Sequence, residues 1–283
     1  MNSKSDAWER LLSVATRRVQ KSVAKVAAGR SREMVVGTGA SGDKTLLADL
    51  KAEEELTTAL RRIEGLRILS EEAGILGDAE GKTLAVIDPL DGSSNFKRGI
   101  PFYCTSVAIA EGRYLSGVRT AMVRNLVNGD VYFAVKGKGA TKNGERISTT
   151  GRGELDRSVL GVDLSGTSGE AISGLVPLLA RAGRVVHYGA NALELCLLAE
   201  GKIDAFVDVR GRMRVTDIAG GYLIAREAGA SVSLVGTPPS APEFSLETRF
   251  SLVASGNQSL HRRIMGCIGS SGGTSENPFL RPA

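Results

Sequence analysis

Two carboxylates stand three residues apart in the segment IDPLDGSSNF, residues 87–96. Asp88 follows an apolar run, and Asp91 is followed by Gly92 and two serines. The apolar run predicts a buried strand, and Pro89 is expected to end its pairing because proline has no backbone N–H to donate. A β-turn would use aspartate, proline and glycine in the same way, so this segment alone does not separate a turn from a chemical site.

Further acids stand at comparable places in the chain. Glu71 follows the short apolar stretch RILS, and Asp217 stands at the start of a predicted helix. A solvated loop charge and a helix N-terminal acid would account for these two residues singly. Acids at strand ends and helix starts can, however, converge at one edge of a sheet, and like charges held together need a cation. Carboxylates without histidine or cysteine favour magnesium or manganese.

The glycine and serines after Asp91 suit a phosphate. Gly92, Ser93 and Ser94 can present backbone N–H groups and hydroxyls to phosphate oxygens. Two metal ions can hold the attacking and leaving oxygens of a phosphoryl transfer. The segment therefore predicts acids that hold metal next to a turn that holds phosphate.

The elements around these residues alternate in type. The apolar spacing predicts helices over residues 5–29 and 48–63, short strands at 67–70 and 83–88, and an antiparallel meander over 103–135. Asn143-Gly144 predicts a hairpin turn. After residue 150 strands alternate with helices, starting near 169, 190, 216 and 257. The order predicts a layered α+β and α/β fold.

The pattern suggests three segments. Residues 1–150 are expected to form an N-terminal α+β half with most metal ligands. Residues 151–268 are expected to form a C-terminal α/β half with the substrate pocket. Residues 269–283 are rich in glycine, serine and proline, and we expect a disordered tail there.

Composition limits the partners of the 283-residue chain. The formal net charge of +5 is spread along the sequence without a run of like charges, which argues against nucleic-acid binding and suits small anionic substrates. Neither a signal-peptide core nor an 18-residue apolar stretch occurs, so we expect no membrane span and a cytoplasmic location. Three distant cysteines match neither a metal site nor a disulfide framework.

Four segments together resemble a known superfamily. SGDKTLLADLKAEEEL, SEEAG, IDPLDGSSNF and TDIAGGYLIAREAGA are similar, in order and spacing, to the signatures of the inositol monophosphatase and fructose-1,6-bisphosphatase superfamily. The resemblance covers residues 5–267 and is greatest to archaeal enzymes with both activities. It implies an αβαβα sandwich of the sugar phosphatase type and a homodimer.

The resemblance also implies roles for individual residues. Two or three Mg²⁺ ions per site, with Mn²⁺ as the alternative, would be bound by Glu71, Asp88, the Leu90 carbonyl, Asp91 and Asp217. Asp49 and Ser93 would activate the attacking water. Ser93 replaces the usual threonine and keeps the hydroxyl without the branch. Asp91, Gly92, Ser93, Asn191 and Arg210 would contact the substrate.

Arg210 is the departure that bears on substrate choice. Inositol-specific members of the family tend to carry an acid there, whereas arginine can bind a second phosphate through two parallel hydrogen bonds. A solvated basic loop is the alternative interpretation. Val186 stands where archaeal relatives can carry arginine, which removes one expected contact with a bisphosphate.

The resemblance implies a Mg²⁺-dependent phosphatase that hydrolyses small phosphomonoesters of sugars or polyols by direct attack of water. Fructose-1,6-bisphosphate and inositol-1-phosphate are the expected substrates. One alternative is a phosphatase of NADP or of a nucleotide 3′-phosphate. Another, of a different class, is a non-catalytic phosphate- or metal-binding regulator. The complete set of acids favours catalysis.

Overall fold

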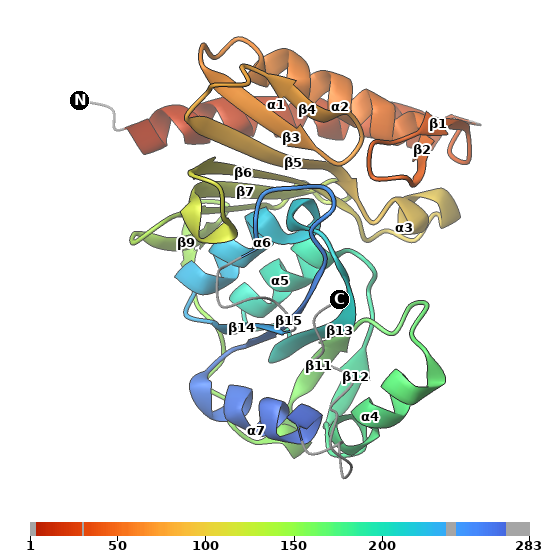
Figure 1. Cartoon of the computed structure of the whole chain (residues 1–283), viewed down its shortest axis with the longest axis vertical. Coiled ribbons are helices and arrows are strands. Elements are labelled where there is room, and N and C mark those ends of the chain that lie inside the picture. Colours follow the sequence, from red (N-terminus) through yellow and green to blue (C-terminus); the bar gives the residue numbers. More distant parts are fainter. Residues whose placement is uncertain (1–3, 30, 236–241, 270–283) are drawn as a thin grey trace.

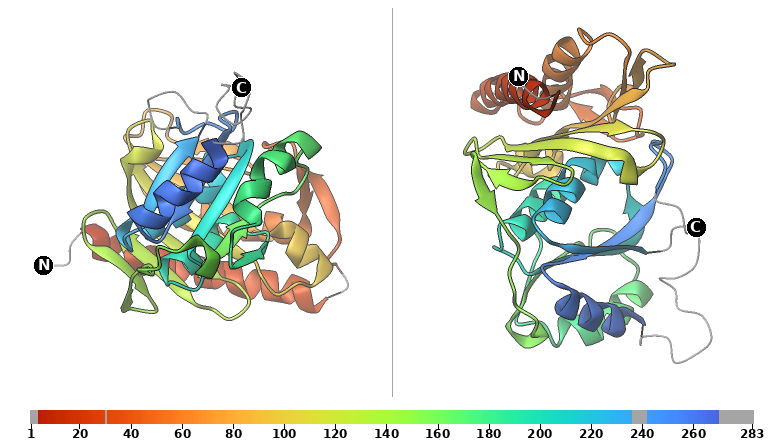
Figure 2. Two further views of the ribbon diagram at one scale, coloured as in Figure 1. Left: turned by 90° about the horizontal axis from the view of Figure 1, so that it is seen from below. Right: turned by 90° about the vertical axis from the view of Figure 1, so that its left-hand side faces the viewer.

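The computed structural model describes residues 4–29, 31–235 and 242–269. The predicted tail, apart from Gly269, lies outside the described residues. The chain forms five layers, in which helices and sheets alternate (Figures 1 and 2). The predicted αβαβα architecture is therefore confirmed. Within the described ranges, no helix combines the length and apolar character needed to cross a membrane.

The first layer consists of α1 (Lys4–Ala28) and α2 (Leu47–Leu60), which lie across the outer face of the first sheet (Figure 1). The buried face of α1 is built from residues three or four positions apart, such as Leu12, Ala15 and Val19. Leu56 and Leu60 of α2 pack into the same cluster. Burial of these stripes fixes both helices on the sheet.

The second layer is an eight-stranded sheet of order β10-β9-β8-β7-β6-β5-β3-β4. Its strands are β3 (Leu66–Ser70), β4 (Gly74–Gly77), β5 (Thr83–Asp91), β6 (Cys104–Glu111), β7 (Val118–Asn125), β8 (Val131–Val135), β9 (Gly139–Lys142) and β10 (Glu145–Ile147). Strands β3 and β5 pair in parallel, and the other neighbours are antiparallel. Helices cover both faces, which explains why β5 is buried along nearly its whole length and is apolar from Leu84 to Ile87.

The middle layer contains α5 (Asn191–Ala199) and α6 (Val215–Glu227), which lie between the two sheets (Figure 1). The two helices approach closely at Gly221, where a Cβ would lie 2.8 Å from the Ala192 carbonyl oxygen. Glycine therefore lets both N-terminal turns reach the same edge of the first sheet.

The second sheet has five strands in the order β12-β11-β13-β15-β14. Its strands are β11 (Val159–Val162), β12 (Arg184–Val186), β13 (Ala205–Met213), β14 (Ser231–Val235) and β15 (Phe250–Ser255). The outer helices α4 (Gly169–Leu179) and α7 (Gln258–Gly269) cover its far face (Figure 1). The division of the chain near residue 150 falls between the two sheets and stays a prediction.

Several local features differ from expectation. The chain does not stop pairing at Pro89: β5 bulges between Asp88 and Asp91 and resumes its pairing with β6 at Asp91, opposite Cys104. A bulge accommodates proline without ending the strand. The hairpin of β1 (Val35–Thr38) with β2 (Lys44–Leu46), strands β4 and β14, and the short helix α3 (Ser93–Arg98) were not predicted.

Candidate functional site: an acidic cluster between sheet and helix

Parallel pairing brings the first two predicted acids together. Ser70 at the end of β3 stands opposite Ile87 of β5, so Glu71, directly after β3, and Asp88, within β5, lie side by side. The Glu71 amide donates to the Ile87 carbonyl across 3.3 Å, which holds this register one residue further. The carboxyl ends of parallel strands meet at one edge, and this edge carries both acids.

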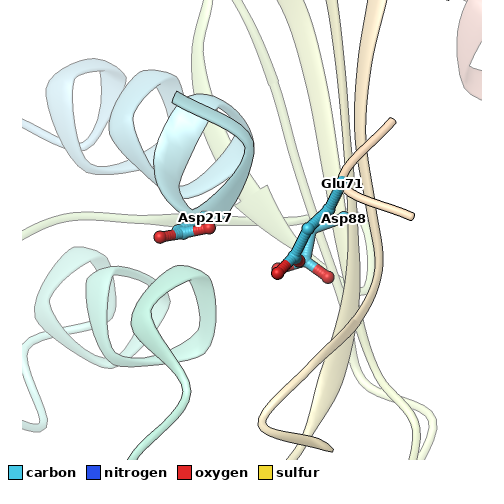
Figure 3. Close-up of side chains that lie close together, drawn as sticks. All are labelled: Glu71, Asp88 and Asp217. Carbon is cyan, nitrogen blue, oxygen red and sulfur yellow. The ribbon is translucent and has the colours of Figure 1, made fainter. Parts of the chain in front are cut away.

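The third acid arrives from the middle layer. Asp217 is the third residue of α6, and its Oδ2 accepts the Arg214 amide across 2.9 Å, an N-terminal capping contact. One oxygen each of Glu71, Asp88 and Asp217 lies within 4.8 Å of the other two. Figure 3 shows the carboxylates of Glu71 and Asp88 next to each other, with Asp217 facing them from α6. We call these three residues the acidic cluster.

Burial and mutual repulsion disfavour three ionised carboxylates in the acidic cluster. Burial raises the pKa of Asp88 well above its usual value, and the nearby Glu71, Asp91 and Asp217 charges raise it further. Burial likewise raises the pKa of Glu71, with Asp217 as the next cause. A bound cation would reverse both effects, and oxygen-only ligands suit a hard divalent ion. The donor set therefore fits magnesium.

Asp91 lies beside the cluster and has a structural partner. Its Oδ1 accepts the Asn191 amide across 3.1 Å and its Oδ2 accepts the Ala192 amide across 2.8 Å, so it caps α5. Burial raises its pKa to about 7, with the Asp217 charge as the next cause, although the two amide bonds oppose the shift. Asp91 thus joins β5 to the start of α5.

Arg214 reaches into the acidic cluster. Its Nη1 donates to Glu71 Oε1 across 2.6 Å, and its Nη2 pairs with Asp43 in the turn between β1 and β2. Its Nε is buried and has no hydrogen-bond partner among the residues that the structure describes. The sequence analysis assigned no role to Arg214. Its position at the N-cap, three residues before Asp217, was the available signal.

Asp49 belongs to an open pocket next to the cluster. The cavity has a volume of about 370 Å³, and its lining includes Asp49, Glu71, Leu90 and Ser93. We call it the acidic pocket. Asp49 is the third residue of α2, and its Oδ2 accepts the Leu46 amide across 2.6 Å. Burial raises the Asp49 pKa to about 7 against this hydrogen bond.

Gly92 shapes the wall that carries Ser93. Its φ of 87° is in the left-handed region, and a Cβ there would lie 3.0 Å from the Phe102 carbonyl oxygen. Ser93 starts α3 directly after it. The glycine therefore turns the chain from β5 into α3 so that Ser93 lines the acidic pocket.

The other two predicted substrate contacts lie outside this pocket. Asn191 lines an adjoining cavity of about 610 Å³ that shares Ser94 with the acidic pocket. Arg210 lines neither cavity: its guanidinium pairs with Asp208 across 2.6 Å and with Asp163 across 2.5 Å. A solvated basic loop is thus not its environment.

Glu194 holds the backbone of Tyr188 and Gly189, which line the adjoining cavity. It is fully buried, and its Oε1 accepts the Gly189 amide across 2.9 Å and the Tyr188 amide across 3.2 Å. Burial raises its pKa to about 7 against these two bonds. The sequence analysis did not single it out because a glutamate inside an apolar helix carries no spacing signal.

Comparison with known proteins identifies the family of this chain. The family model for the inositol monophosphatase family matches residues 7–270. A protein of Methanothermobacter thermautotrophicus, named fructose-1,6-bisphosphatase/inositol-1-monophosphatase, is 36% identical over 270 residues, which cover 91% of this chain and 95% of that protein.

Two further relatives extend the comparison. A Methanococcus maripaludis protein, named bifunctional NADP phosphatase/NAD kinase, is 30% identical over 284 residues, which cover 94% of this chain and 50% of that protein. A solved Pyrococcus horikoshii structure, described as having similarities to inositol-1 monophosphatase, superposes with a TM-score of 0.79 at 28% identity. It covers 93% of this chain and 99% of its own.

Proposed function

This chain belongs to the inositol monophosphatase family and is a phosphoric monoester hydrolase, and we propose that it is a Mg²⁺-dependent phosphatase of small sugar or polyol phosphates. The observation that carries the proposal is the acidic cluster, whose carboxylates converge from the end of β3, from β5 and from the start of α6, and whose Glu71 lines an open pocket. The relative named for fructose-1,6-bisphosphatase and inositol-1-monophosphatase activities supports those two substrates.

The acidic cluster, with Asp91 and the Leu90 carbonyl, is proposed to hold the metal. When bound, Mg²⁺ would neutralise phosphoryl charge and lower the pKa of water, so that the water could lose a proton and attack phosphorus. Glu71, Asp88 and Asp217 provide oxygen ligands from one strand edge and one helix end. Asp91 keeps the start of α5 against that edge through its two amide bonds.

Asp49 is the proposed proton acceptor. Its buried carboxylate has a pKa of about 7 and lines the acidic pocket, so it can take a proton from an attacking water near neutral pH. The Leu46 amide holds one carboxylate oxygen and leaves the other for this task. Ser93, on the same wall, is proposed to orient the water through its hydroxyl.

An NADP phosphatase is the second candidate. The relative named bifunctional NADP phosphatase/NAD kinase favours it, because the chain matches half of that protein. The adjoining cavity has room for a substrate larger than a monosaccharide, and Phe102 and Tyr188 stack at 5.0 Å beside it. The non-catalytic regulator is disfavoured by the complete acidic cluster. The homodimer and the cytoplasmic location remain predictions.

Release of inorganic phosphate from three substrates tests the proposal. Purified protein is given fructose-1,6-bisphosphate, inositol-1-phosphate or NADP with Mg²⁺ or with a chelator. We expect metal-dependent release, with the sugar or polyol phosphates ahead of NADP. Failure with all three substrates in Mg²⁺ would contradict the proposed function, and preference for NADP would select the second candidate.

Arg210→Lys addresses the choice among these substrates, with Arg212→Lys as the matched control on the same strand. Lysine keeps the charge but loses the planar fork. If Arg210 contacts a second phosphate, its variant loses activity on the bisphosphate and keeps activity on inositol-1-phosphate. Equal effects on both would make Arg210 a structural partner of Asp163 and Asp208.

A further inference from the structure

A groove remote from the acidic pocket carries unneutralised positive charge. It lies between α1 and strands β7 to β9, has a volume of about 700 Å³, and shares no lining residue with the acidic pocket or the adjoining cavity. Figure 1 shows β9 at one end of the first sheet and α3 at the other. We call this space the basic groove.

Arg124 is its central feature. The residue is 4% exposed, and its guanidinium donates to Thr16 Oγ1 across 3.0 Å and to the carbonyls of Gly129 and Ser13. All three partners are uncharged. In the described part of the chain no carboxylate lies within ion-pair distance of Arg124. A buried charge without an opposite charge is costly, so it is normally neutralised.

A second arginine adds to the field. Arg17 lines the same groove from α1. Burial is the main cause that lowers the pKa of Arg124, and the Arg17 charge lowers it further. Glu9 is the one acidic residue in the lining of the groove, against Arg17 and Arg124. Asp130, on the turn before β8, pairs with Lys142 across 2.9 Å instead. The groove therefore has a net positive lining.

The groove also has the shape and donors for a ligand. Its volume falls in the range of small-molecule sites and exceeds what a single ion needs. Guanidinium has five N–H donors, of which Arg124 uses three within the protein. Ser13 and Thr141 place hydroxyls on the same lining. Arginine forks match phosphate oxygens in geometry and charge.

We propose that the basic groove is a second anion site, which takes the phosphate group of a small phosphorylated molecule between Arg17 and Arg124. The site is separate from the reaction and does not depend on the proposed function. Phosphate bound there would supply the counter-charge that Arg124 lacks within the described chain.

Anion titration of metal-free protein tests this. The ¹⁵N-labelled full chain is kept in a chelator, so that the acidic cluster repels anions, and is titrated with inorganic phosphate. We expect saturable shifts of the Ser13 and Gly129 amide signals and a rise in Tm, because binding to the folded state stabilises it. A titration that leaves both amides unshifted overturns the proposal.

Arg17→Gln and Arg18→Gln form a matched pair, since both arginines are exposed on α1 but only Arg17 lines the groove. Loss of one charge-assisted contact should weaken phosphate binding about tenfold in Arg17→Gln. Arg18→Gln should bind like the wild type. Equal weakening in both would mean a general surface field and would overturn the site.

Arg124→Lys and malonate complete the test. Lysine keeps the buried charge and loses the fork, so we expect weaker phosphate binding by a folded protein. Wild-type affinity in this variant would contradict a role for Arg124. Malonate, a dicarboxylate, should bind less tightly than phosphate, and the reverse order would overturn the phosphate assignment.

Discussion

Arg214 donates to Glu71 across 2.6 Å, so a cation of the chain itself lies at the edge of the acidic cluster. The same guanidinium contacts Asp43 and thereby ties the β1–β2 turn to the cluster. The turn is also fixed by the Ala40 and Ser41 amides, which donate to the carbonyls of Glu72 and Glu71. Arg214 therefore stabilises the metal-free site, and we expect it to compete with a bound metal for Glu71.

Replacing Arg214 should separate these two effects. In Arg214→Gln the Glu71 carboxylate loses its partner, so Mn²⁺ should bind several-fold more tightly while the metal-free protein loses about 1–3 kcal/mol of stability. Electron paramagnetic resonance of free Mn²⁺ and urea unfolding in chelator measure both. Arg212→Gln is the control, an exposed arginine two residues away. Weaker Mn²⁺ binding in Arg214→Gln would show that Arg214 assists the metal.

Asp88→Asn should remove activity and stabilise the metal-free chain. Loss of one ligand is expected to lower kcat/KM about 1,000-fold, or ~4 kcal/mol, because metal charge stabilisation is lost. The neutral amide also relieves repulsion with Glu71 and Asp217, so Tm in chelator should rise. The exposed Asp156→Asn is the control. Full Mg²⁺-dependent activity in Asp88→Asn would refute the metal site.

Asp49→Asn tests proton transfer apart from metal binding. Loss of a general base should lower kcat about 100-fold or more with little change in Mn²⁺ affinity. The amide oxygen can still accept the Leu46 N–H, so α2 keeps its cap. Glu54→Gln, on the exposed face of the same helix, should leave kcat unchanged. A parallel loss of Mn²⁺ binding would instead make Asp49 a metal ligand.

Glu194 should make stability depend on pH. Its pKa rises from 4.5 to about 7 on folding, so between these values the folded state holds a proton that the unfolded state has lost. Stability from this residue is then present at low pH and lost as pH rises toward 7, by up to roughly 3 kcal/mol. Urea unfolding of Glu194→Gln in chelator should lack this component, whereas Glu64→Gln, an exposed control, should retain it. Parallel pH profiles for wild type and Glu194→Gln would contradict the shift.

The convergence of Glu71, Asp88 and Asp217 could be anticipated from sequence, because each stands at the end or start of a strongly patterned element. Strand ends and helix starts carry local signals: apolar runs, glycines and capping acids. The layered fold followed from the order of these elements. The prediction that pairing ends at Pro89 was wrong, because β5 forms a bulge there and resumes its pairing at Asp91. The local residues give no signal for this bulge.

The contacts of Arg210, Arg214 and Glu194 could not be predicted in the same way. Arg210 meets Asp163, which follows the neighbouring strand β11, and Arg214 meets Asp43 in the β1–β2 turn. Partners so distant in sequence are chosen by tertiary packing, which spacing does not encode. Nearby arginines in the pattern therefore looked alike, although Arg212 is exposed and Arg210 is ion-paired.

The acidic cluster draws Glu71 and Asp88 from the first sheet and Asp217 from a helix that enters much later in the chain. A ribosome therefore makes two of the three carboxylates long before the third, and domains form as their residues emerge. Without Asp217, Glu71 and Asp88 of a nascent chain are expected to bind divalent ions only weakly. If the acidic cluster holds a metal as proposed, its capture would come late in biosynthesis, after α6 has been made and packed against the first sheet.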